Sequence, residues 1–347
     1  MSTDSNDAWD IEPGQDWDVF LFQPEDAEGV SRLFRSVYGE GYAVRTYVEP
    51  AMLIAENAAH RVISSVAKTP GGEVVGHNAL FNSAAHPGTY ESGAGVVHQA
   101  YRGGKGIFTR MVDHGIEVAR QFPHLNAVFC EPVCNHLFSQ KLTDKAGFPP
   151  RALEVDLIPP SIHQEQDGRA GRVAAFLVFR TFRPRPHTVY LPAVYRDELD
   201  FLYQGLDDSR DFRISEQGIP ARSVSEIRPQ IFDFAQVARV AVHEVGEDFA
   251  PTLDRLEKEL QGRSIHVNQI WVNLACPWSG QAVEILRDRG YFLGGPLPRW
   301  FDSDGLLMQK ILKRPNWEEI QVLDNHYAEI LRRIRADWER SLEARRD

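Results

Sequence analysis

The sequence has few cysteines and no long apolar run. Its 347 residues include three cysteines, Cys130, Cys134 and Cys276, an odd and small number that does not suit a disulfide framework. No stretch reaches the roughly 20 apolar residues that a membrane-spanning helix needs. These absences indicate a reducing compartment, and we expect a cytoplasmic protein.

Positive charge is also scarce. Lysine and arginine number 38 against 49 aspartates and glutamates, so the formal net charge is −11. Nucleic-acid binding without sequence preference requires basic surface, and an anionic membrane surface would repel this chain. The N-terminal stretch "MSTDSNDAWDIEPGQDWD" is acidic and lacks the features of a secretory signal. We therefore expect no nucleic-acid partner and no membrane partner, and a monomer or homodimer.

The composition is that of a globular protein with about two domains. Hydrophobic residues make up 43% of the chain and charged residues 25%, which is close to the average for folded domains. We expect four segments. They are a disordered leader over 1–15, a first α/β unit over 16–185, a second unit over 186–314 and a C-terminal amphipathic helix over 315–347.

Hydrophobic periodicity predicts a mixed α/β order in the first unit. Strands are expected at Asp18–Gln23, Arg61–Lys68, Val74–Asn82, Tyr90–His98 and Asn126–Val133. Helices are expected at Pro24–Tyr42, Ala51–Ala58 and Asn135–Ala146, and another directly after Gly106. Asn135 would cap its helix and Gly147 would end it. A further helix, Trp317–Leu342, is expected near the C-terminus.

A glycine-rich loop joins the strand that ends at His98 to the next helix. Its residues Arg102–Gly106 read "RGGKG". Backbone amides of such a loop and the positive end of the helix favour an anion such as phosphate, and Arg102 and Lys105 add full charges. A flexible turn with two surface cations is the plainer alternative. The spacing fits neither an ATP-binding P-loop nor a dinucleotide fingerprint.

Two motifs resemble the GNAT superfamily of acetyltransferases. In "VVHQAYRGGKGIF" the family pattern is matched in order, and "NHLFSQKLTDKAGF" resembles the family's later helix and its x-G-F turn. The loop is one residue longer than usual and has Gln99 or Ala100 where a proline is common. The resemblance implies a mixed, mostly antiparallel sheet flanked by helices. It also implies binding of acetyl-CoA by Val97, His98, Arg102, Gly103, Gly104, Lys105, Gly106, Ile107 and Asn135.

The second half resembles a degenerate copy of the same unit. The order strand, helix, strand, helix, strand recurs there, and "DRGY" echoes "KAGF". The segment that corresponds to the glycine loop reads "HEVGEDF", which is acidic and would repel a pyrophosphate. We therefore expect one acetyl-CoA site, located in the first half.

The resemblance implies transfer of the acetyl group by direct attack of an amine. The tyrosine that often returns a proton to the thiolate would fall at Thr143, which is a poor acid, so Ser139 and His136 are the candidate donors. Glu131 is the preferred candidate base and Glu91 the second. Glu91, Trp300, Asp302 and Asp304 are candidates for binding the substrate, the last three as a lip that recognises a cationic acceptor.

The grouping "CEPVCNH" does not have zinc-site spacing, and we expect no metal. The sequence thus predicts an N-acetyltransferase that moves an acetyl group from acetyl-CoA to a primary amine of a small molecule or a protein. The alternative is a non-catalytic, regulatory module that binds acyl-CoA.

Overall fold

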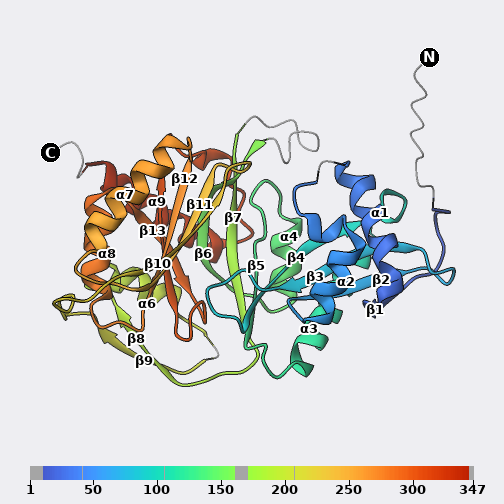
Figure 1. The fold of residues 1–347 in the computed structure, drawn as a ribbon, viewed down its shortest axis with the longest axis horizontal. Coiled ribbons are helices and arrows are strands. Elements are labelled where there is room, and N and C mark those ends of the chain that lie inside the picture. The colour runs from blue at the N-terminus through green and yellow to red at the C-terminus, as the bar shows by residue number, and fades with distance from the viewer. Residues whose placement is uncertain (1–10, 41, 105, 161–170, 207, 344–347) are drawn as a thin grey trace, which may run out of the picture. The chain divides into compact units, whose positions relative to one another are not determined.

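The computed structural model describes residues 11–40, 42–104, 106–160, 171–206 and 208–343. They form a mixed α/β protein whose sheets are mostly antiparallel and flanked by helices (Figure 1), as predicted. Contacts divide the chain into two compact units. Unit 1 is the described part of Met1–Ser83 with Tyr90–Val128, and unit 2 is Ala84–Thr89 with the described part of Phe129–Asp347.

Unit 1 contains an antiparallel run of four strands. In spatial order they are β1 (Asp18–Leu21), β2 (Val62–Lys68), β3 (Val74–Phe81) and β4 (Thr89–Val97). Its helices are α1 (Ala27–Tyr38), α2 (Pro50–Ala58) and α3 (Ile107–Gln121), with short 3-10 turns η1 (Pro24–Asp26), η2 (Arg45–Tyr47) and η3 (Gln99–Tyr101). Helix α1 ends at Tyr38, earlier than predicted, because Gly39 takes a positive φ of 77°.

Two apolar clusters form the core of unit 1. In α1, Val30, Leu33 and Phe34 are fully buried at helical spacing and pack with residues of α2, β2 and β3. The second cluster joins Ile107 and Met111 of α3 to Tyr101 and Ile11.

The end of the predicted disordered leader belongs to this second cluster. Ile11 is only 2% exposed, and the hydroxyl of Tyr101 donates a hydrogen bond of 2.7 Å to the carbonyl of Glu12. The expectation of disorder is therefore wrong for residues 11–15. Residues 1–10 lie outside the described part.

Unit 2 contains the strands after β4, except that the first two residues of β5 belong to unit 1. Strands β5 (Ala127–Cys130), β7 (Val173–Thr181) and β6 (Pro150–Ile158) lie in that spatial order. A five-stranded sheet has the order β10 (Glu226–Phe232), β11 (Val237–Glu244), β12 (Val267–Asn273), β14 (Gly305–Ile311) and β13 (Phe292–Leu297). Strands β8 (His187–Leu191) and β9 (Arg210–Ile214) pair separately.

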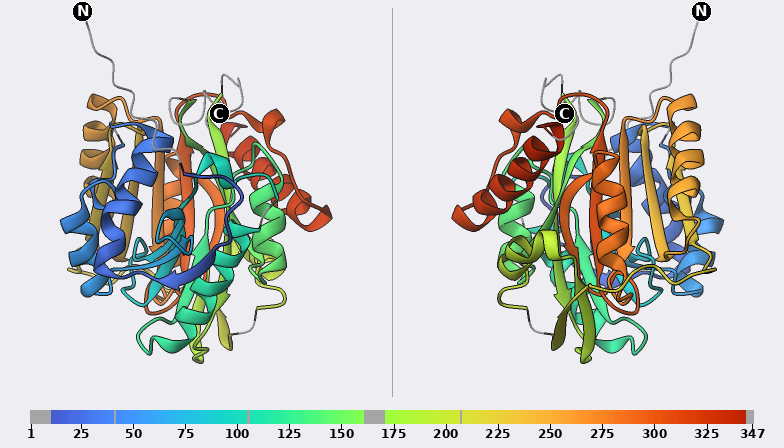
Figure 2. Two further views of the ribbon diagram at one scale, coloured as in Figure 1. Left: turned by 90° about the vertical axis from the view of Figure 1, so that its right-hand side faces the viewer. Right: turned by 90° about the vertical axis from the view of Figure 1, so that its left-hand side faces the viewer.

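The helices of unit 2 are α4 (Phe138–Lys145), α6 (Arg196–Leu202), α7 (Phe249–Gly262), α8 (Ser279–Asp288) and α9 (Asn325–Glu343). Two 3-10 turns, η4 (Ala193–Tyr195) and η5 (Trp317–Glu319), complete it. Figure 2 shows α7 (pale orange) and α9 (red) on opposite sides of the strands of this unit. Within the described ranges, no helix combines the length and apolar character needed to cross a membrane.

The internal repeat is visible in the order of elements. The series β4–α3–β5–α4–β6–β7 recurs as β11–α7–β12–α8–β13–β14, and in each series the last strand lies between the two before it in space. The contact-based division assigns β6 to unit 2 because β6 packs against β13 and α9. The unit boundaries predicted from the sequence, at 185/186 and 314/315, were placed according to the repeat. They stay a prediction.

Two predicted helices begin later than expected. Helix α4 begins at Phe138 with Leu137 at its N-cap, so Asn135 is not its cap. The C-terminal helix begins at Asn325, because the side chain of Asp324 accepts hydrogen bonds from the amides of His326 and Tyr327.

Candidate functional site

The loop between β4 and α3 exposes main-chain amides. Gly103, Gly104 and Gly106 have φ values of +87°, +93° and +74°, which side chains other than glycine rarely adopt. All three are exposed, and within the described ranges no acceptor takes the amide hydrogen of any of them. The amides are therefore available to an external anion. Lys105 lies outside the described residues.

Both ends of this loop are fixed by packing. Tyr101 is held by its hydrogen bond to Glu12, and Ile107 is buried at the start of α3. A Cβ on Gly76 would lie 2.9 Å from Ile107 and 3.0 Å from the sulfur of Met111, so α3 lies very close to β3. The first turn of α3 has no side-chain cap. The dipole of α3 adds to the attraction for an anion.

Arg102 supplies positive charge at the loop. Its Nε donates a hydrogen bond of 2.9 Å to the carbonyl of Val97 at the end of β4, which turns the exposed guanidinium back toward the strand. His98 is buried, and its ring accepts a hydrogen bond from the amide of Ala100. His98 thus shapes the turn before the loop.

A β-bulge lies in β4, a few residues before the loop. Ala79 pairs with Gly93 and His77 pairs with Val96, so β4 carries one extra residue, and Ala94 has a φ of +50°. Such an extra residue is left out of the ladder of hydrogen bonds. The bulge therefore presents backbone polar groups in the middle of a strand.

His77 holds the bulge in place. Burial lowers the pKa of His77 to about 4, so the ring is neutral at pH 7. Its Nδ1 donates to the carbonyl of Ala94 at 2.9 Å, which assigns the proton to Nδ1. Its Nε2 then accepts from the hydroxyl of Ser64 at 3.0 Å.

The strand around the bulge is accessible. Residues 91–95 are half-buried, whereas residues 74–80 of β3 are fully buried. The hydroxyl of Ser83 donates to Oε2 of Glu91 at 2.7 Å, and Oε1 lies 3.0 Å from where a Cβ on Gly93 would be. The carboxylate of Glu91 thus lies beside Gly93, next to the bulge.

Glu131, the preferred candidate base, lies in unit 2 and is paired with a cation. Arg239 donates to Glu131 at 2.8 Å and to Glu154 at 3.0 Å, and Gln269 donates to Glu154 at 2.9 Å. Burial and the charge of Glu131 raise the pKa of Glu154 to about 8, against the opposing effect of Arg239. The sequence offered no sign of this cluster, because its members lie on four separate strands or strand ends.

The other candidates from the second motif take different positions within unit 2. His136 is exposed, and the buried hydroxyl of Ser139 has no hydrogen-bond partner among the described residues. Thr143 is buried, and its hydroxyl bonds the carbonyls of Ser139 and Gln140 within α4. It therefore serves its own helix.

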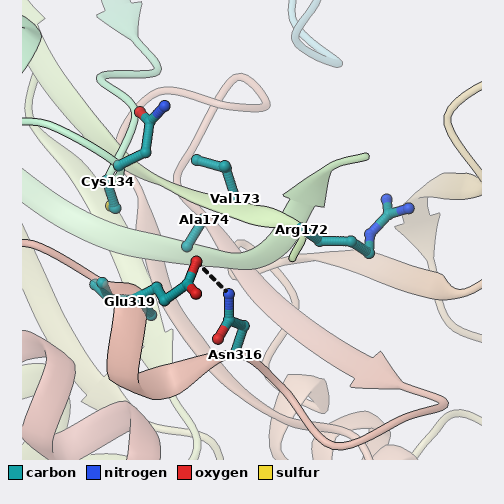
Figure 3. A pocket seen from close by; sticks show the side chains of 8 residues that line it. Cys134, Arg172, Val173, Ala174, Asn316 and Glu319 are labelled. Atoms are coloured by element: carbon teal, nitrogen blue, oxygen red, sulfur yellow. Dashed lines mark hydrogen bonds between the residues drawn. The ribbon is translucent and has the colours of Figure 1, made fainter. Parts of the chain in front are cut away.

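Asn135 lines a small pocket in unit 2. Figure 3 shows other lining residues, among them Cys134, Ala174, Asn316 and Glu319, with Asn316 bonded to Glu319 at 3.0 Å. The carbonyl of Asn135 accepts a hydrogen bond from Gln321. Asn135 thus contacts the segment before α9.

The acidic lip expected near Trp300 is not present in the predicted form. Trp300 is 1% exposed and packs against Phe129 and Trp271. Asp304 is fully buried and pairs with Arg210 at 2.6 Å and His187 at 3.1 Å. Although burial opposes ionisation, these two partners hold the pKa of Asp304 well below its usual range.

Asp302 is exposed, but it pairs with Arg185 at 2.8 Å and with His86 at 3.6 Å. The charges of both aspartates are thus compensated by neighbours in unit 2. Attraction of a cationic acceptor by this group does not fit the structure.

In unit 2 the loop that corresponds to the glycine loop is closed by the chain itself. The amide of Glu247 donates to the carbonyl of Ser223 at 3.1 Å, and the amide of Gly246 donates to the hydroxyl of Ser225 at 2.9 Å. A Cβ on Gly246 would lie 2.5 Å from the Ser223 carbonyl. The amides that could bind a phosphate are therefore already used.

The three cysteines are buried and form no disulfide. Burial, with the charge of Glu244, raises the pKa of Cys276 to about 12. Over the described ranges, no three His, Cys, Asp or Glu residues are grouped so that they could hold a metal ion.

Solved structures that match this chain include several acetyltransferases, one of them described as a putative acetyltransferase of the GNAT family, and each of these covers about half of the chain. Ribosomal-protein-S5-alanine acetyltransferase from Vibrio fischeri has a TM-score of 0.39 and 16% identity over 50% of this chain and 97% of its own. The N-acetyltransferase from Staphylococcus aureus Mu50 has a TM-score of 0.40 and 15% identity over 49% and 100%.

The protein yncA from Salmonella typhimurium, solved with acetyl-CoA, has a TM-score of 0.38 and 14% identity over 49% of this chain and 96% of its own. At these scores the likeness concerns general architecture only. No protein-family model matches the sequence. No curated protein matches it either.

Proposed function

We propose that this protein is an N-acetyltransferase that moves the acetyl group of acetyl-CoA to a primary amine. The observation that carries the proposal is the β4–α3 loop, where three exposed glycine amides without acceptors meet a helix N-terminus and Arg102. In the proposal, the pyrophosphate of the cofactor is bound by Val97, His98 and residues 102–107, which include Lys105. Binding of the cofactor by Asn135 stays a prediction from the resemblance.

The bulge in β4 supports the chemistry. Acetyl-CoA supplies an activated thioester, and a backbone amide freed at Ala94–Gly95 would polarise its carbonyl. The amine nitrogen forms a bond to the carbonyl carbon, the carbon–sulfur bond breaks, and the thiolate leaves and takes up a proton. The ammonium first loses its proton to a base. Glu91 suits this role because its carboxylate lies next to the bulge.

Glu131, Ser139 and His136 remain alternatives for the proton transfers. Glu131 is less suited as a base than predicted, because Arg239 is bound to it. Replacing Glu131 by glutamine should reduce the rate if it is the base and leave the affinity for coenzyme A unchanged. Unchanged turnover would remove it from the mechanism.

Thermal stabilisation by coenzyme A tests the loop assignment. The double variant Arg102→Ala/Lys105→Ala should lose most of this stabilisation. The control Arg228→Ala, which removes an exposed cation of unit 2, should keep it. Full stabilisation of the double variant would refute the assignment.

A non-catalytic module that binds acyl-CoA is the second candidate. Two observations favour it: Thr143 bonds to its own helix, and the loop of unit 2 is closed by Ser223 and Ser225. Release of free thiol from acetyl-CoA in the presence of a panel of amines separates the two. Binding without any amine-dependent thiol release would support the module.

A further inference from the structure

A group of aromatic side chains packs at the end of α1 in unit 1. The rings of Phe34 and Tyr47 stack at 4.9 Å between centroids, and those of Tyr38 and Tyr42 stack at 4.8 Å. Phe34 also contacts Tyr42 at 5.3 Å, which joins the two stacks. Tyr47 is buried, Tyr42 is half-buried and Tyr38 is 42% exposed. The group thus extends from the core to the surface.

This aromatic group lies on the same face of the sheet as Glu91. Ala79 and Phe81 pack with Phe34 and Tyr47, and they pair in register with Gly93 and Glu91. Directly paired residues of neighbouring strands point to the same face. The carboxylate of Glu91 and the half-buried Gly93 beside it therefore face the aromatic side.

Two electrostatic interactions join Tyr38 and Tyr42 to charged residues of β4 and the loop. Burial raises the pKa of Tyr42, and the neighbouring Tyr38 and the charge of Glu91 add to this effect. Burial also raises the pKa of Tyr38, with an opposing effect of Arg102. The hydroxyl of Tyr42 thus lies in the field of Glu91 and that of Tyr38 in the field of Arg102.

We propose that Tyr38, Tyr42 and Glu91 form the acceptor subsite, and that it takes a primary amine with one positive charge and an apolar body. This inference rests on the proposed function. The ammonium is attracted by the Glu91 carboxylate and by the π faces of the tyrosines. Loss of its proton to Glu91 leaves the nitrogen beside the bulge, where it attacks the thioester carbonyl and the thiol departs.

The charge distribution favours a monoamine over a polyamine. Glu91 lies in the first half of β4, and the guanidinium of Arg102 is bonded to the carbonyl of Val97 at the end of the same strand. A second ammonium would meet Arg102, whereas an apolar body can pack on the ring of Tyr38. The subsite therefore differs in charge from one that would bind spermidine.

The test measures thiol release from acetyl-CoA with phenethylamine, spermidine or a peptide with a free N-terminus as acceptor. We expect kcat/KM for phenethylamine to exceed that for spermidine by about 10-fold or more. Tyr38→Ala and Tyr42→Leu should raise KM for phenethylamine by about 3- to 10-fold and leave KM for acetyl-CoA unchanged. Tyr42→Phe should retain activity, and Glu91→Gln should lower kcat.

Controls separate this inference from the proposed function. Phe234→Leu, an exposed aromatic of unit 2, should change neither KM. Tyr38 is exposed enough for its alanine variant to fold, so a misfolded Tyr42→Leu does not end the test. Preference for spermidine, no turnover of phenethylamine, or unchanged KM in Tyr38→Ala would overturn the inference even when coenzyme A stabilises the protein. Lack of any stabilisation by coenzyme A would refute the proposed function itself.

Discussion

Replacing Glu154 by glutamine should stabilise unit 2, and the gain should increase with pH. Glu154 is 1% exposed and shares Arg239 with Glu131, so one cation faces two carboxylates. Burial raises the pKa of Glu154 to about 8, compared with an ordinary value of about 4.3. The fold therefore favours the neutral acid, which glutamine imitates.

The sign follows from linkage between proton binding and folding. The folded state binds the proton of Glu154 more tightly than the unfolded state, so this group contributes stability that is complete below about pH 4.3 and is lost as the pH rises to about 8. Glutamine does not titrate. The difference in free energy of unfolding between variant and parent should grow by about 1.4 kcal/mol per pH unit over this interval and reach roughly 5 kcal/mol.

Urea unfolding followed by tryptophan fluorescence measures this difference, because Trp271 and Trp300 are both buried in unit 2. Measurements at pH 5.5 and pH 8.5 should give a small and a large gain, respectively. Glu226→Gln, at an exposed ion pair, is the control and should have a similar effect at both values. An equal difference for Glu154→Gln at both values, or a loss at pH 8.5, would refute the reasoning.

Two further substitutions test the framework around the sites. Asp337→Ala should lower the free energy of unfolding by about 3–5 kcal/mol. It removes the fully buried carboxylate that lies 3.0 Å from Arg287 and that accepts a hydrogen bond of 2.7 Å from the Leu293 amide. Urea unfolding measures this loss, and a loss below about 1 kcal/mol would contradict the prediction. Gly95→Ala should weaken coenzyme A binding about 10-fold or more, because the added Cβ would overlap the ring of Phe108 in the first turn of α3. Titration calorimetry measures the affinity, and an unchanged affinity would contradict the prediction.

Local features of this protein could be predicted because they depend on neighbours in sequence. The glycines of the loop directly precede α3, and their positive φ values follow from the residue type. The repeated order of strands and helices follows from hydrophobic periodicity in each segment. Helix boundaries were less well predicted, since the start of α9 depends on the side chain of Asp324 and that of α4 on the turn after β5.

The partners of charged residues could not be predicted, because they come from distant parts of the chain. Glu131 is 108 residues from Arg239, and Asp304 is 94 residues from Arg210. Nothing in the local pattern distinguishes such a paired carboxylate from one that is free to act as a base or to bind a substrate. The motifs likewise did not indicate that Tyr38 and Tyr42 lie on the face of the sheet to which Glu91 points.

The sequence alone determined the kind of elements, the repeat and the location of a loop suited to an anion, because backbone conformation and periodicity are local properties. Tertiary structure alone decided which carboxylates are compensated, which amides stay open in unit 1 and which are closed in unit 2. Those outcomes depend on burial and on charges brought together by folding, and both arise only when distant segments pack.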